Sequence, residues 1–272
     1  MLRYLSIFLM FARACLIRDM TFRANFLLEC VTSLGWMSMN LAFYLLIFQF
    51  TPEIGSGTGW SKAPFFAFVA TGMIINAIVQ AFFMPSAEEF TELVRTGGLD
   101  TVLVRPLDAQ FLLSLHRVNF SSLANGFVGV GILVWSLLSL DHPVPWIAWI
   151  LYPGLILCGV MILYGLIIML AAATIFMGRN QSLYDFWFYI TNFSRYPAEI
   201  YVGPWGSPLR ALCTFVIPIL LVVNIPARVV AQPLVGRDWW PVAGAFCASL
   251  ASLCISRVVF QSALVKYRSA SS

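Results

Sequence analysis

The chain has 272 residues, of which 60% are hydrophobic and 10% are charged, with a formal net charge of +4 and a mean hydropathy of +0.86. Soluble domains contain only about 45–50% apolar residues, so this composition excludes a soluble globular protein and indicates a protein of the lipid bilayer. The basic residues never form a run of three. They therefore argue against nucleic-acid binding and are better interpreted as signals of membrane topology.

The first segment, residues 1–25, carries arginines at positions 3, 13, 18 and 23 among apolar residues. We expect it to form an interfacial entry helix, with a plain cytoplasmic tail as the alternative. Positively charged segments resist translocation. A cytoplasmic N-terminus leaves thirteen of the sixteen basic residues in the cytoplasm, and only Lys62, Arg228 and Arg237 on the other side. Both termini, including the tail 263–272, are therefore predicted to be cytoplasmic.

Six apolar runs are long enough for spanning helices, which need about 20 residues each. They are residues 26–50, 64–84, 118–140, 147–177, 210–231 and 240–262. These runs predict an all-α, polytopic membrane protein: one transmembrane domain over residues 1–272, with spans one and two in 26–84, spans three and four in 118–177, and spans five and six in 210–262. The fourth run is longer than a span requires, so its start is expected in the outer interface.

The most hydrophilic stretch, residues 85–117, connects the second and third spans and is predicted to be cytoplasmic. Pro85 ends the second span, and Ser86 with Glu89 three residues later predicts a capping box, in which each side chain bonds the backbone amide of the other residue. Gly97 is expected to end the helix in a left-handed conformation.

The charges of this short helix fit its dipole, because Glu88 and Glu92 lie towards its start and Arg95 lies at its end. Phe90 and Leu93 give it an apolar side. A rigid helix of this kind transmits displacement from a docked partner. An ordinary capped connecting helix fits the same pattern equally well.

Residues 178–209 are aromatic enough to resemble a seventh span, but a seventh span would place the last three basic residues outside the cytoplasm. Gln181, Asp185, Asn192 and Arg195 fall on one helical stripe. We therefore expect an interfacial segment on the cytoplasmic side, with a re-entrant insertion as the alternative.

In the fifth predicted span, Pro218 and Pro226 remove backbone hydrogen bonds and predict a hinge or a break near the outer face. A simple kink that serves packing is the alternative. Asn224 lies between them and is expected to contact a neighbouring helix.

Familiar catalytic and cofactor patterns are missing. There is no GxxxxGK[ST] loop, the six cysteines form no CxxC pair, and the two histidines, His116 and His142, lie on opposite sides in the predicted topology. We expect no catalytic residues, no metal site and no cofactor bound by this chain. A transport function would then need an outside energy source.

The stretch RTGGLDTVLVRPLD, residues 95–108, closely resembles the signature of a bacterial subfamily of ABC transporter type 2 permeases. The order of the motifs is kept downstream by RYPAEIY at 195–201, PLR at 208–210, IP at 217–218, NIPAR at 224–228 and LVKYRSAS near the end. The similarity thus covers nearly the whole chain. Gly98 departs from the pattern, because many relatives carry a charged or polar residue there.

This resemblance implies an ABC type 2 permease fold, in which 85–117 is a coupling region and residues 87–96 form a coupling helix. The residues that it implies for contact with a separate ATPase are Ser86, Glu88, Glu89, Phe90, Glu92, Leu93, Arg95, Thr96, Gly97, Leu99, Asp100, Arg105 and Pro106. A second contact is implied at Asp185, Asn192 and Arg195, and a hinge at Pro218, Asn224 and Pro226.

The implied function is that of a permease subunit of an exporter in the bacterial inner membrane. ATP and Mg would be bound by two copies of a partner ABC ATPase, since 272 residues leave no room for such a domain here. A second permease, identical or a paralogue, would complete the transporter. The scarcity of charge in the spans suggests an apolar or amphiphilic substrate. The alternatives are a membrane anchor that recruits an ATPase without moving cargo, and a secondary carrier that works without ATP.

Overall fold

The structure is a computed structural model that describes residues 2–55, 57–104, 107–177, 182–232 and 239–267. Within these ranges the regular structure is helical, and the one β-type pairing is an isolated bridge between Glu53 and Ser61. Apolar helices suit a bilayer because all of their backbone hydrogen bonds are made within the segment. The predicted all-α membrane class is therefore confirmed.

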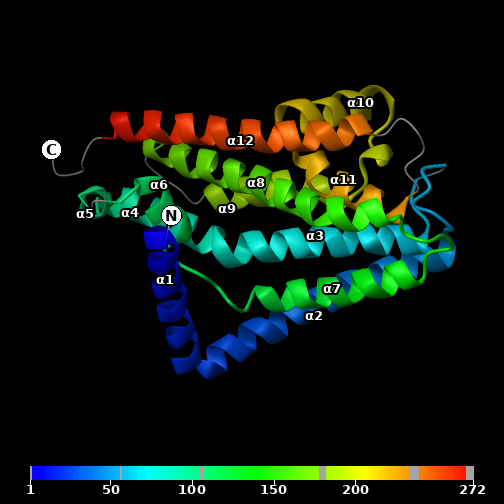
Figure 1. Cartoon of the computed structure of the whole chain (residues 1–272), viewed down its shortest axis with the longest axis horizontal. Helices are drawn as coiled ribbons and strands as arrows, with labels where there is room; N and C mark the ends of the chain where they lie inside the picture. Colours follow the sequence, from blue (N-terminus) through cyan, green and yellow to red (C-terminus); the bar gives the residue numbers. More distant parts are fainter. Residues whose placement is uncertain (1, 56, 105–106, 178–181, 233–238, 268–272) are drawn as a thin grey trace.

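Four helices are long and apolar enough to cross a membrane: α2 (Arg23–Phe50), α3 (Lys62–Phe82), α8 (Trp146–Met177) and α12 (Trp239–Lys266). They correspond to the first, second, fourth and sixth predicted spans. The third predicted span is the shorter helix α7 (Leu123–Leu138). α3, α7, α8 and α12 run along the long axis of the molecule (Figure 1). In the described part of the chain, helices of membrane length thus number four, or five with the bent pair described below.

Three short helices gather at one end of the bundle, between the end of α3 and the start of α7 (Figure 1). They are α4 (Met84–Thr96), α5 (Leu99–Leu103) and α6 (Ala109–Leu115). We call this the α4 end. The opposite end, which holds the loop 51–61 between α2 and α3, is called the Trp60 end after the fully buried side chain in that loop.

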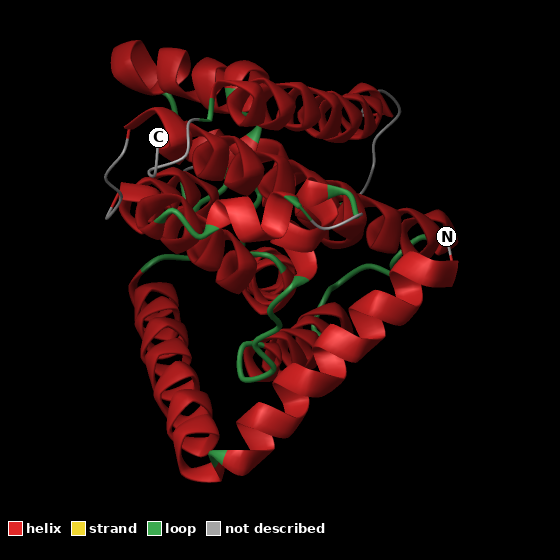
Figure 2. Ribbon diagram, turned by 90° about the vertical axis from the view of Figure 1, so that its left-hand side faces the viewer, coloured by secondary structure: helices red, strands yellow, loops and turns green. Residues whose placement is uncertain are grey.

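The N-terminal helix α1 (Leu2–Thr21) meets α2 in a V (Figure 2). One face of α1 packs against the α4 end, where the rings of Tyr4 and Phe111 lie 4.8 Å apart and those of Phe11 and His116 lie 4.9 Å apart. The predicted entry segment is thus a helix fixed to the same end as α4.

The segment after α8 extends from the α4 end towards the Trp60 end through α9 (Ser182–Asn192) and two 3-10 turns, η1 (Phe193–Arg195) and η2 (Ala198–Ile200). Its far end is fixed by Trp60, whose indole N–H donates to Glu199 Oε2 at 3.0 Å. The prediction placed 178–209 on the cytoplasmic side and loop 51–61 outside. This hydrogen bond joins the two, so the whole segment does not lie at the α4 end, and its path agrees better with the re-entrant alternative.

The prediction for 178–209 therefore needs correction: its second half lies at the Trp60 end, not at the α4 end. The physical reason is that its apolar face is used inside the bundle, where Trp187 is only 3% exposed and Ala198 only 5% exposed. A helix buried on that face has no need of an interfacial position.

The next segment is sharply bent. α10 (Gly203–Ala211) continues into a π-helical turn, η3 (Leu212–Val216), and the chain then turns by 89° before α11 (Ile219–Ala231). α11 is buried almost throughout, against α3 and α8. Its last residues return to the Trp60 end, where the side chain of Gln232 lies against Gly59. The run 210–231 is thus not one straight helix: it is bent at Pro218, where the sequence predicts a hinge or a break.

Candidate functional site

The helix α4 has the stop signal that its sequence predicts. It ends at Thr96, and Gly97 has a φ of 75° in the left-handed region that glycine adopts at little cost. The start differs from the prediction, because α4 begins at Met84, with Phe83 in the N-cap position.

The predicted capping box between Ser86 and Glu89 does not form. Since the helix starts three residues early, Ser86 lies inside its first turn, where its hydroxyl accepts from the Arg117 amide at 2.9 Å and donates to the Arg117 carbonyl at 3.1 Å. Glu89 Oε2 lies 2.8 Å from Arg117 Nε and 2.9 Å from His116 Nδ1. Both residues therefore tie α4 to the segment that leads into α7.

The apolar side of α4 is buried within the chain. Phe90 is 1% exposed, and its ring lies 5.7 Å from that of Phe260 in α12. Leu99 at the start of α5 is fully buried. Phe90 and Leu99 were predicted to contact a partner, but their side chains hold α4 and α5 on the bundle. Leu93 and Val94 are half-buried.

The exposed side of α4 is a polar stripe formed by Glu88, Glu92, Arg95 and Thr96. Arg95 donates two hydrogen bonds to the Glu92 carboxylate, one from Nε at 2.8 Å and one from Nη2. The hydrogen bond from Arg95 lowers the pKa of the Glu92 carboxyl, whereas burial raises the pKa of Glu88. We call these four residues the α4 stripe.

Two polar contacts anchor the α4 end to the long helices. Asp108 caps α6 by accepting from the Phe111 amide at 3.0 Å, and it also accepts from Arg257 Nη1 in α12 at 3.0 Å. The hydrogen bond from Arg257 lowers the pKa of the Asp108 carboxyl. Gln110 accepts from the same guanidinium at 2.9 Å and donates to the Tyr164 hydroxyl of α8 at 3.1 Å. The motif search missed this cluster because its members are far apart in sequence.

Three predicted contact residues of this region receive no further geometric support. Arg105 and Pro106 lie outside the described residues, as does the side chain of Asp185 in α9. Asp100 lies in the first turn of α5, next to the α4 stripe in sequence.

At the Trp60 end, Glu199 is the centre of a second cluster. Besides Trp60, its carboxylate accepts from Asn224 Nδ2 at 3.3 Å and lies 3.4 Å from Arg228 Nη1. Asn224 Oδ1 also accepts from the Ala198 amide. The contact predicted for Asn224 is therefore present, and it joins α11 to η2.

The two prolines predicted as a hinge have different places. Pro218 lies at the 89° bend, between η3 and α11. Pro226 lies inside α11 and is buried.

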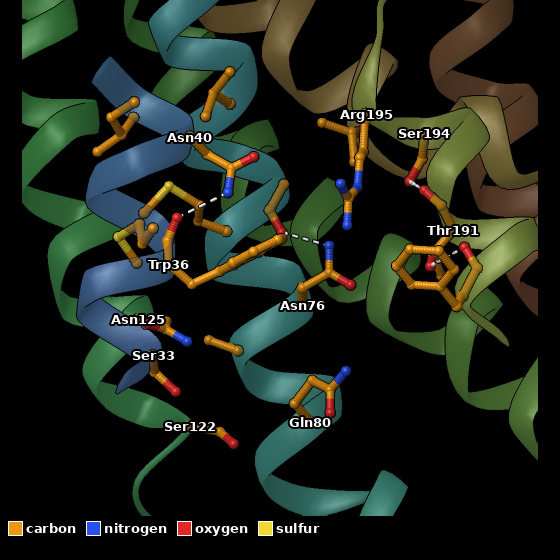
Figure 3. A pocket seen from close by; sticks show the side chains of 18 of the residues that line it. Ser33, Trp36, Asn40, Asn76, Gln80, Ser122, Asn125, Thr191, Ser194 and Arg195 are labelled. Carbon is orange, nitrogen blue, oxygen red and sulfur yellow. Dashed lines mark hydrogen bonds between the residues drawn. The ribbon is translucent and has the colours of Figure 1, made fainter. Parts of the chain in front are cut away.

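A groove lies between α2, α3, the start of α7 and the α9–η1 segment, and its volume is about 650 Å³. Its polar lining includes Asn40, Asn76, Gln80, Asn125, Thr191 and Arg195 (Figure 3). Glu29 lies where the groove approaches the α4 end, and Arg195 lies four residues before Glu199 of the Trp60 end.

Arg195 was predicted to contact an ATPase, together with Asn192. The Arg195 side chain lines the groove (Figure 3), and its contact with an ATPase stays a prediction. Its guanidinium lies 5.6 Å from the centre of the Phe188 ring. A charged side chain within a spanning segment costs about 3 kcal/mol on insertion scales, so such a residue usually has a functional role.

Among the residues that the structure describes, no three His, Cys, Asp or Glu side chains form a group that would hold a metal ion. The features that remain are an exposed stripe on a firmly anchored helix and a polar groove in an apolar bundle.

Comparison with known proteins completes this description. The sequence profile of the ABC-2 family of transporter proteins matches residues 34–271. No curated protein and no solved structure matches the chain. Because the profile match extends over most of the chain, which has several helices of membrane length, the protein belongs to the ABC-2 transporter family and is a multi-pass membrane permease subunit of an ABC transporter, a kind of subunit that works with an ABC ATPase.

Proposed function

We propose that this chain is the permease of an ATP-driven exporter whose ATPase docks on the α4 stripe. The observation that carries the proposal is the way in which α4 is packed against the long helices. Its apolar face is fixed to α12 by Phe90, and the neighbouring α6 is tied to the same helix by Asp108, whereas the opposite face of α4 is exposed. A displacement applied to that face would pass to the long helices rather than be absorbed by a loop.

The α4 end is cytoplasmic in this proposal. We infer six crossings, made by α2, α3, α7, α8, the α9–η2 segment and α12, with the bent segment 203–231 re-entering from the Trp60 side. This topology keeps both termini on the α4 side, where most basic residues lie. In this orientation, an exporter would move its substrate from the α4 end to the Trp60 end.

We propose that the groove forms one half of a transport path. The position of α2 supports a transport path, because α2 forms one wall of the groove and only 11% of its most apolar stretch is buried within the chain. A second permease, identical or a paralogue, would cover this side, and two ATPase copies would bind ATP and Mg. Pro218 is proposed as the point about which the bent segment moves.

The docking proposal is tested by charge reversal. In the double variant Glu88→Lys, Glu92→Lys, we expect the ABC ATPase to be lost from the complex purified through a tag on the permease, because two of the four stripe residues change sign. Both residues lie on the exposed face of α4, so membrane insertion and the thermal midpoint should change little.

The matched control is Lys62→Glu, an exposed charge at the Trp60 end. It should leave the ATPase in the complex. Retention of the ATPase by the double variant, or its loss from the Lys62→Glu control alone, would contradict docking on the α4 stripe.

A further inference from the structure

Three asparagines of the groove have amide oxygens without a hydrogen-bond partner among the described residues. The amide nitrogens of Asn40 and Asn76 donate to the backbone carbonyls of Trp36 and Gly72, at 2.8 and 2.9 Å, and their amide oxygens make no recorded hydrogen bond (Figure 3). The Oδ1 atom of Asn125 is buried and has no hydrogen-bond partner among the described residues. Carbonyl oxygens of this kind bind hydroxyl or amide donors of a ligand.

The groove also contains one cation without a carboxylate partner. Within the described ranges, Arg195 makes no ion pair and no hydrogen bond, although it lies over the Phe188 ring. The acidic residue of the groove, Glu29, is already bonded by Asn25 Nδ2 at 2.8 Å and by the Ser121 hydroxyl at 2.9 Å. A guanidinium favours an anionic partner with planar or tetrahedral oxygens.

The lining also has an apolar and aromatic part. Trp36, Tyr44, Phe68 and Trp187 line the groove, and Trp36 is 62% exposed on the side of α2 that the chain leaves uncovered. The volume of about 650 Å³ lies in the range of small-molecule sites, about 300–1,000 Å³. A headgroup and the first part of a hydrocarbon chain fit such a space, with the rest of the chain beside α2.

We infer that the groove binds an anionic amphiphile, whose acidic headgroup pairs with Arg195 and whose headgroup hydroxyls donate to the amide oxygens of Asn40 and Asn76. The inference rests on the proposed transport function, for which it names the class of substrate. It narrows the expectation of an apolar or amphiphilic cargo, because Arg195 adds a requirement for negative charge.

The test measures binding to the full chain in phosphatidylcholine nanodiscs by calorimetric titration, with empty nanodiscs as the baseline. Dioctanoyl phosphatidylglycerol carries a phosphate and two hydroxyls, and it should bind saturably. Dioctanoyl phosphatidylcholine and inorganic phosphate should each bind at least about tenfold more weakly, since each lacks part of the required chemistry.

The variant Arg195→Gln should weaken binding of the phosphatidylglycerol probe by about tenfold or more, and Arg195→Lys should restore part of it. Arg210→Gln is the matched control, because Arg210 is an exposed arginine of α10 outside the groove. It should bind the probe as the unaltered chain does.

Three results would overturn the inference: equal affinity for the phosphatidylcholine probe, inorganic phosphate binding as tightly as the lipid, or unchanged lipid binding by Arg195→Gln. If Arg195→Gln binds the lipid unchanged and paired permeases also separate, Arg195 belongs to the subunit interface instead. The proposed function has its own test, because the ATPase should remain with Arg195→Gln whether or not that variant binds lipid. Absence of the ATPase from the complex of the unaltered chain would speak against the proposed function.

Discussion

Individual polar side chains decide how the two ends of this bundle are held. At the α4 end Asp108 and Arg257 meet across 149 positions of sequence, and at the Trp60 end Glu199 and Trp60 meet across 139 positions. Each contact is partly buried, so its loss leaves a polar atom without a partner in a place that water enters poorly. These contacts hold the short helices in fixed positions, and one of them is made by Asp108, the last residue of the 95–108 signature.

The Asp108 pair gives a pH-dependent prediction. Because the pKa of Asp108 is lowered in the folded chain, the pair contributes its full stability above the ordinary carboxyl pKa of about 4, and the contribution is lost as pH falls through the lowered value. Asp108→Asn should therefore cost about 1 kcal/mol at neutral pH, a small value because both side chains are partly exposed.

Thermal unfolding of the purified chain in detergent, recorded between pH 3 and pH 8, measures this difference. It should shrink towards zero at the acid end. Asp141→Asn, in an exposed loop, is the control and should not lower the midpoint at neutral pH. A gap for Asp108→Asn that stays constant over the whole range would argue against the charged pair as its cause.

Phe90 shows how burial changes the choice of test. Its position on α4 suggested a partner contact, yet its side chain packs against Phe260. Removing a buried phenylalanine costs about 3–5 kcal/mol, so Phe90→Ala would lower stability whether or not an ATPase docks nearby. The exposed residues of the α4 stripe are therefore the informative positions.

At the scale of elements, α8 and α12 approach each other closely through small residues. A Cβ atom added at Gly165 of α8 would lie 2.1 Å from Ser252 Oγ and 3.0 Å from the Ser252 carbonyl oxygen of α12. The Ser252 hydroxyl also donates to the Ile162 carbonyl of α8 at 3.3 Å. Small residues at such crossings allow helices to pack without a hydrophobic driving force between them.

Gly165→Ala should therefore destabilise the chain by about 1–3 kcal/mol, because α12 must move away and the serine bond is lost. Gly154→Ala is the matched control on the same helix, since its added Cβ would lie 3.7 Å from the Phe246 ring, an ordinary contact. Thermal midpoints of the two variants measure the effect. Equal midpoints would mean that the helices are not packed as closely as described.

The bent segment is the element that sequence patterns describe least well. Its residues 210–231 form one apolar run of membrane length, and Pro218 alone signals an interruption. The direction of the bend depends on contacts made elsewhere, among them Asn224 with Glu199 and Val222 with the backbone at Gly159. Such contacts join distant parts of the chain, and no local pattern specifies them.

For the whole molecule, the features set by local chemistry were predictable. Apolar runs gave α2, α3, α8 and α12, and Gly97 gave the end of α4. The path of residues 178–231 was not, because an aromatic segment with a few polar residues suits an interface and a buried crossing equally. Arg195 was the available signal: a cation in an apolar stretch, followed four residues later by Glu199, favours a polar groove over a surface helix.

The groove as a site was likewise beyond prediction. Nothing in the local sequence marks Asn76, Asn125 and Glu29 as neighbours. Their shared position depends on the packing of α2, α3 and α7 around α9. The helix α4, in contrast, was predicted from its motif. Which of its faces is buried could only be seen from its packing in the bundle.

The most direct test of the central claim is photo-crosslinking from a single position of the α4 stripe. A photoreactive amino acid replacing Glu92 of the full chain in native membranes should form a covalent product with the ABC ATPase, whereas the same group replacing exposed Ser139 at the Trp60 end should form none. An ATPase product from position 139, or no ATPase product from position 92 in a complex that still contains the ATPase, would contradict docking at the α4 end.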